Sequence, residues 1–288
     1  MIDVLLLVIL AMLYTGQSYF NKMYSASRNG AGTEQFSVIY GAFAGIATFA
    51  VNGLRYAPSK ITLSLGLLNA IMLILYNLSM QRSAHLGSFA FLMVCSLSGG
   101  MMFPLIYDVL FLGTHLKIYQ YLAFAFVLAA GIIMNMDGFR DKKSGKYLAW
   151  CLVLAVSNGL YGIIMNYQQQ LMDFTKRNEM IMTTFLGVTV MLSASQLIVR
   201  PKRFLEDFKM SGISLVYLLS SAACATVAVN LLLFLMKRFS VTLLNVADNG
   251  GVLVLSMILA VTALKEKVNK KSVVGFILAC AGIILLSL

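Results

Sequence analysis

Residues 245–251 read Asn-Val-Ala-Asp-Asn-Gly-Gly, a polar run broken by two glycines inside an apolar segment that spans Ser240 to Leu264. The flanks of this run have the composition of a helix embedded in hydrocarbon. A carboxylate at Asp248 inside such a helix costs about 3 kcal/mol, and residues of this kind face a bundle interior or a wet cavity. Gly250 and Gly251 mark a place where the backbone bends or another group approaches closely. The run therefore indicates part of a solute pathway.

The composition of the chain defines its class. Of 288 residues, 60% are hydrophobic and only 11% are charged, which predicts an all-α polytopic membrane protein in contact with the lipid bilayer. The net charge of +11 raises nucleic acid as a partner, but the basic residues fall in short gaps between apolar runs. Positively charged cytoplasmic loops explain this pattern more simply. We expect a multi-pass protein of the cell membrane and no nucleic-acid partner.

The apolar runs predict ten transmembrane helices, because a spanning helix needs about 20 apolar residues. The connections between them are short, and a charged one divides the chain into a first five-helix repeat (1–137), a linker (138–146) and a second five-helix repeat (147–288). The predicted spans are 3–22, 35–53, 61–81, 87–112, 119–136, 147–169, 180–199, 213–236, 240–264 and 271–288.

An internal repeat supports this division. A shift of 151 residues aligns Gly99–Gly100 with Gly250–Gly251, and Ala130–Ile133 with Ala281–Ile284, in one register. Five spans per half is an odd number, so two halves of one fold must enter the membrane in opposite orientations. This inverted repeat is typical of secondary transporters, whose glycine-broken helices point to the binding site. The predicted helix breaks are Gly99, Gly100, Pro104, Gly250 and Gly251.

The end of each half resembles the drug/metabolite transporter superfamily of EamA-type ten-helix carriers. In each half an apolar helix is followed by a short polar loop and by a helix that contains Ala-Gly-Ile-Ile. Glu266 matches the acidic residue of the family in this loop, whereas the first half carries His115 at the equivalent position. Lys22 resembles the lysine often found at the end of the first span. The resemblance implies a carrier with peripheral fifth and tenth spans, and it does not specify a substrate.

Two arguments give opposite orientations of the chain in the membrane. The gaps after odd-numbered spans hold fifteen of the 22 basic residues and the other gaps hold seven, which places both termini outside the cytoplasm. The family resemblance implies termini inside.

Candidate site residues are polar or aromatic groups that must avoid lipid. Asp248 and Asp108 are the candidate coupling residues, and Asp108 lies about one turn from the end of its span, where it also reaches interfacial water. Helical spacing places other polar residues on single helix faces, where hydrogen bonds between helices are the simpler explanation for each one alone. The candidate substrate-binding residues are Tyr14, Gln17, Asn69, Tyr76, Asn158, Tyr161, Asn245, Asp248 and Asn249.

Enzyme and cofactor signatures are missing from the sequence. No phosphate-binding loop, zinc-protease motif or clustered metal ligands occur, so neither catalysis, nor a cofactor, nor a metal is expected. The four cysteines have no paired spacing and are interpreted as packing residues. We predict a secondary transporter that moves a small polar, cationic or amphipathic organic solute by alternating access, coupled to a proton or to an exchanged solute. A flippase for a lipid-linked substrate and a receptor or structural subunit are alternatives, and monomer and homodimer stay open.

Overall fold

The computed structural model describes residues 2–111, 113, 117–135, 142–171, 176–235, 246–266 and 269–286, and this part of the chain contains helices and no β-strand. The first half contributes α1 (Ile2–Ser27), α2 (Thr33–Val51), α3 (Lys60–Ala84), α4 (Phe89–Phe111) and α5 (Ile118–Asn135). The remainder contributes α6 (Lys142–Leu171), α7 (Arg177–Val199), α8 (Pro201–Asp207), α9 (Gly212–Leu235), the π-helix η3 (Val246–Gly250), α11 (Gly251–Thr262) and α12 (Lys270–Leu286).

Most helix bounds lie within a few residues of the predicted ones, and two connections differ from the prediction. Pro201–Asp207 belongs to the predicted connection between the spans 180–199 and 213–236, and it forms the short helix α8. Proline at the first helical position favours this start, because its missing N–H would have no partner there. The predicted linker 138–146 is partly helical, since α6 begins at Lys142. Residues 136–141 of that connection lie outside the described residues.

Six of the described helices are long and apolar enough to cross a membrane. They are α2, α3, α4, the segment Gly145–Gln168 of α6, α7 and α9. Large apolar side chains also cover much of the outer surface, as Ile46 (64% exposed) and Val190 (66% exposed) illustrate. In water such a surface would be unfavourable, whereas lipid tails solvate it.

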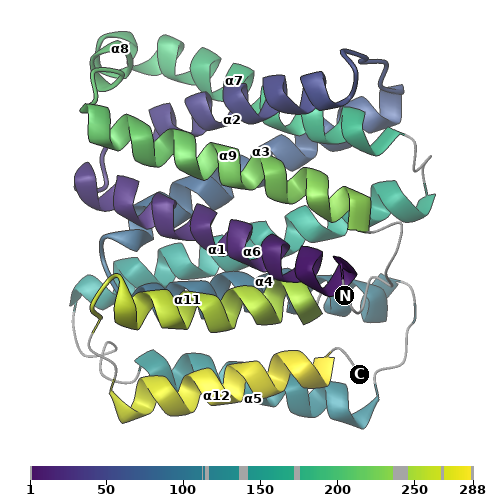
Figure 1. Ribbon diagram of the computed structural model, residues 1–288, viewed down its shortest axis with the longest axis vertical. Helices are drawn as coiled ribbons and strands as arrows, with labels where there is room; N and C mark the ends of the chain where they lie inside the picture. Colours follow the sequence, from purple (N-terminus) through teal and green to yellow (C-terminus); the bar gives the residue numbers. More distant parts are fainter. Residues whose placement is uncertain are drawn as a thin grey trace.

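The helices lie roughly along one direction, and helices from opposite halves of the chain pack against each other (Figure 1). The extensive pairs are α1 with α9, α2 with α7, α3 with α6 and α7, and α4 with α6. α5 and α12 form a pair at one edge of the molecule (Figure 1), and both contact α4. The interior between α1, α3, α4, α6 and η3 is therefore built from residues far apart in sequence.

Glycines allow the closest of these helix contacts. Gly99 of α4 lies against the backbone of Ala155 in α6, and Gly159 of α6 lies against the Phe103 side chain of α4. A Cβ atom at either glycine would overlap with its neighbour. Small residues at helix contacts are the usual way for helices to approach each other in lipid.

Candidate functional site

The π-helix η3 positions Asp248 within the bundle. Tyr14 of α1 and Tyr76 of α3 lie close enough to interact electrostatically with the Asp248 carboxylate. Tyr161 of α6 interacts with both tyrosines, so four elements contribute to one cluster. A π-turn adds a residue to the helix, shifts the register of the side chains and frees backbone groups, and such turns occur frequently at functional sites.

The side chains of this cluster lie inside the bundle and are still partly accessible to solvent. Asp248, Tyr14, Tyr76 and Tyr161 are all surrounded by protein, yet each keeps an intermediate solvent-accessible surface. A close-packed core would leave such residues without accessible surface. These four polar side chains are therefore not fully packed by their neighbours.

One further tyrosine, Tyr40, adjoins the cluster and was not among the residues predicted from the sequence. Tyr40 of α2 is 2% exposed and interacts with Tyr76 and Tyr161. The Gln17 side-chain amide donates a hydrogen bond to the Tyr40 hydroxyl at 3.0 Å. Gln17 is itself only 8% exposed, so in this conformation it orients Tyr40 and offers little surface to a solute.

The network continues along α1 toward α9. The Ser221 hydroxyl donates to the Asn21 side chain at 2.7 Å, and both residues are buried. Hydrogen bonds of this kind join α1, α2 and α9, as the simpler explanation of a polar helix face predicts.

Three amide side chains on α3 have no hydrogen-bond partner among the described residues. Asn69, Asn77 and Gln81 are fully buried, and neither polar atom of any of these side chains has a partner within the described residues. Asn69 was a predicted site residue, whereas Asn77 and Gln81 follow it at helical spacing and were not singled out. An unpaired buried amide costs about 1–3 kcal/mol for each group, which water or a solute can offset.

Asn158 and the first glycine pair have a packing role. The Asn158 amide donates to the Ser96 carbonyl of α4 at 2.8 Å, and its side chain lies over Gly100. The structure differs here from the predicted helix break, because α4 is continuous through Gly99, Gly100 and Pro104. The glycines allow α6 to approach α4 without interrupting the helix.

The remaining candidates have different positions. Asn249 is partly exposed beside Asp248 in η3, and Gly250 and Gly251 mark the change from the π-helix to α11. Asp108 lies in α4, but its side chain is not among those described. Asn245 and His115 lie outside the described residues.

An ion pair joins the two halves at the ends of the helices. Lys22 Nζ, from the penultimate turn of α1, lies 2.5 Å from the carboxylate of Glu266, which follows α11. The same carboxylate accepts hydrogen bonds from the Phe89 backbone N–H at 2.8 Å and from the Ser88 hydroxyl at 2.9 Å. Glu266 therefore caps the N-terminus of α4, where a negative charge is stabilised by the free amides and the helix dipole.

Comparisons with known proteins identify the family. The EamA-like transporter family matches residues 145–288, half of the chain, and the chain belongs to this family. No curated protein matches the chain. A crystal structure of another protein superposes with a TM-score of 0.64 at 13% sequence identity, covering 98% of this chain and 95% of that one. This likeness concerns the fold alone.

Family and helices together define the class of protein. The chain is a multi-pass membrane protein of a family of small-molecule transporters, and the family consists of transporters and not of enzymes. Among the residues that the structure describes, no group of three or more His, Cys, Asp or Glu side chains could hold a metal ion.

Proposed function

We propose that the protein is a secondary carrier that moves a small polar organic solute with a cationic or amphipathic group by alternating access. One observation carries this proposal: the Asp248 carboxylate is deep in the bundle, partly exposed, and within electrostatic reach of Tyr14 and Tyr76 from other helices. Ionisable residues within membrane helices mark substrate or ion pathways.

We propose ten spans arranged as two inverted repeats. In a two-fold arrangement the helices α1, α2, α3, α4 and α5 correspond to α6, α7, α9, α11 and α12, in this order. The pair α1–α9 then corresponds to the pair α6–α3, and the pair α4–α6 corresponds to the pair α11–α1. Both partners of each exchange are packed pairs, and α2–α7, α4–α11 and α5–α12 map onto themselves. A two-fold relation between the halves gives this pattern. An odd number of spans per half then makes the repeats antiparallel in the membrane.

The chemistry of the cluster favours a cation or a solute with hydrogen-bond donors. A carboxylate attracts an ammonium group strongly where water is scarce. Aromatic faces at Tyr14, Tyr76 and Tyr161 add cation–π attraction, and their hydroxyl groups both donate and accept hydrogen bonds. A proton or a second solute that exchanges on the same carboxylate would couple the two directions of transport.

In this proposal, the ion pair of Lys22 with Glu266 closes the pathway at the end of the bundle where the connections after the odd-numbered spans lie. It bridges the two halves, and its side chains are 14% and 18% exposed. Alternating access moves the halves relative to each other around the site, so contacts between their ends must form in one state and break in the other. The unpaired amides of α3 would then find partners when the helices separate.

A ligand screen tests this proposal. Purified protein would be melted in the presence of amino acids, quaternary amines, nucleotide sugars and cationic drugs, since a ligand that binds the native state raises the melting temperature. The shift should appear with a cationic or amphipathic compound and disappear in Asp248→Asn. Glu206→Gln, which removes an exposed carboxylate of α8, is the matched control and should keep the shift. A ligand that shifts Asp248→Asn as much as the wild type would contradict the proposed site.

A further inference from the structure

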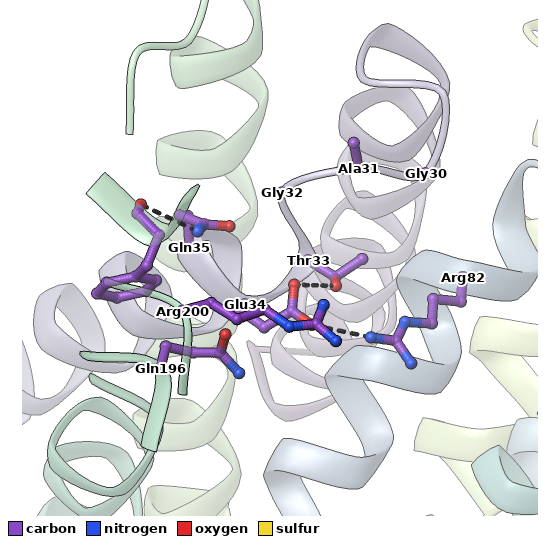
Figure 2. A pocket seen from close by; sticks show the side chains of 10 residues that line it. Gly30, Ala31, Gly32, Thr33, Glu34, Gln35, Arg82, Gln196 and Arg200 are labelled. Carbon is purple, nitrogen blue, oxygen red and sulfur yellow. Dashed lines mark hydrogen bonds and ion pairs between the residues drawn. The ribbon is translucent and has the colours of Figure 1, made fainter. Parts of the chain in front are cut away.

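A separate pocket of about 150 Å³ lies at the ends of the helices, away from the Asp248 cluster. It is lined by the loop before α2, the first turn of α2, Arg82 of α3, and the end of α7 with the start of α8. Figure 2 shows Glu34, Arg82 and Arg200 converging on it. No step of the proposed transport mechanism uses these residues.

The charges of the pocket leave one cation unmatched. The Glu34 carboxylate is paired with the Arg82 guanidinium at 2.8 Å and accepts a hydrogen bond from the Thr33 hydroxyl at 2.7 Å (Figure 2). The guanidinium of Arg200 has no ion pair with any residue that the structure describes, and it is exposed. The pocket therefore carries a net positive charge from Arg200.

The N-terminus of α2 adds backbone N–H donors, which carry a partial positive charge. Gly32 is the N-cap residue, and no side chain caps the helix there. The amides of the first turn have no partner within the helix and carry the positive end of its dipole. Anionic oxygens bind readily at such an end, especially beside an arginine.

A buried acceptor that lines the pocket is unsatisfied. Gln35 is 2% exposed, and its side-chain nitrogen donates to the Phe204 carbonyl at 3.2 Å (Figure 2). Its Oε1 atom has no hydrogen-bond partner within the described residues. A matching ligand must therefore bring a hydrogen-bond donor as well as anionic oxygens.

The surroundings of the pocket indicate that the ligand comes from the membrane. Ile198 and Val199, directly before Arg200, are 81% and 68% exposed, and Leu205 of α8 is 60% exposed. These apolar side chains need lipid tails, while Arg200 and Lys202 next to them need headgroups or water. Basic pockets between the ends of transmembrane helices bind lipid headgroups.

We propose that this pocket binds the headgroup of a phospholipid, with the phosphate on Arg200 and the first turn of α2, and a headgroup hydroxyl donating to Gln35 Oε1. The volume suits a phosphate with a short polar extension. This lipid would hold the loop before α2 and the start of α8 together at the membrane surface.

Native mass spectrometry of the full chain in detergent, titrated with phosphatidylglycerol, tests the site. Arg200→Gln should weaken binding about tenfold, because it removes a charged hydrogen-bond donor. Lys202→Gln is the matched control, since this exposed lysine on α8 lies outside the pocket, and its affinity should change less than twofold. Equal losses in both variants would reduce the effect to general surface charge and overturn the proposal.

Two further ligands separate the parts of the proposal. Phosphatidylmethanol has the same phosphodiester charge without a donor and should bind several-fold more weakly than phosphatidylglycerol, because Gln35 Oε1 stays unpaired. Glycerol phosphate, which lacks acyl chains, should bind far more weakly. Equal binding of phosphatidylmethanol would refute the role of Gln35, and glycerol phosphate binding as tightly as the lipid would make the pocket a soluble-phosphate site.

Discussion

The two glycine pairs related by the 151-residue repeat have different surroundings in the structure. Gly99 and Gly100 lie within a continuous α-helix that packs tightly on α6, whereas Gly250 ends the π-helix that carries Asp248 and Gly251 begins α11. The residue equivalent to Asp248 in the first half is Leu97, an apolar residue that is 8% exposed. The glycines thus serve close helix packing in the first half, and the second half adds a carboxylate and a change of helix type. Gly251 also lies close to another helix, at Ala11 of α1, so close packing is common to both pairs, and the carboxylate and the π-helix distinguish the second.

Leu97→Asp places a carboxylate in the first half at the position equivalent to Asp248 and gives the largest expected effect. Leu97 packs in the core, so the variant loses apolar contacts and buries a charge without free space beside it. We expect a loss of about 4 kcal/mol in the free energy of unfolding. Leu97→Asn, which loses the contacts without the charge, should lose less in SDS-induced unfolding. Wild-type stability for Leu97→Asp would mean that both halves tolerate a carboxylate equally.

Gly99→Ala tests the packing role of the first glycine pair. Its new Cβ would overlap with the Ala155 backbone, which cannot rotate away. A cost of about 2 kcal/mol follows from overpacking of this kind. Should the melting temperature of the variant match that of the wild type, the close α4–α6 contact would not contribute as described.

The ion pair between the halves should give a smaller effect. We expect a coupling energy of about 1 kcal/mol between Lys22→Met and Glu266→Gln in a double-mutant cycle of unfolding free energies. Burial of the pair and its contact with the N-terminus of α4 raise this value above that of an exposed pair. Strictly additive single effects would show that Lys22 and Glu266 stabilise the fold independently.

Gly145→Ala gives the smallest expected effect, and its sign is opposite to that of Gly99→Ala. Gly145 lies in the first turn of α6, and a Cβ atom added to it would have no neighbouring atom within 4 Å, so a methyl group fits there. The substitution should raise the melting temperature through a gain of about 0.5–1 kcal/mol in stability. Destabilisation by Gly145→Ala would show that alanine is unfavourable in these helices even where no neighbouring atom is close, and the Gly99 result could then not be assigned to the contact with Ala155.

Apolar runs predicted where the helices lie, because burial in lipid requires them over a fixed length. The same reasoning singled out Asp248 as a candidate, because its charge contrasts with its apolar surroundings, and its role stays a prediction. Partners across helices were harder to predict. Lys22 and Glu266 are 244 positions apart, and Tyr40 lies in a segment that reads as an ordinary apolar helix. Cys95 and Cys151, interpreted as separate packing residues, interact across the α4–α6 contact. Such pairs depend on how helices pack, and local spacing does not encode this.

The pocket at the N-terminus of α2 also required the structure. Residues 28–35 read as a glycine-containing turn, and Arg82 and Arg200 belong to connections that positive loops explain adequately. Only the folded chain brings these residues around one space beside exposed apolar side chains. A basic residue in a loop is therefore informative when its neighbours in space are known.

Counterflow transport by Asp248→Asn, reconstituted in liposomes with a ligand from the melting screen, tests the role of Asp248 most directly. Asparagine preserves the shape of the side chain but not its charge, so the variant should elute as a folded protein in size-exclusion chromatography. We predict that its concentrative uptake falls to the level of empty liposomes, while Glu206→Gln transports like the wild type. Wild-type uptake by Asp248→Asn would show that Asp248 has a structural role and that transport does not depend on its charge.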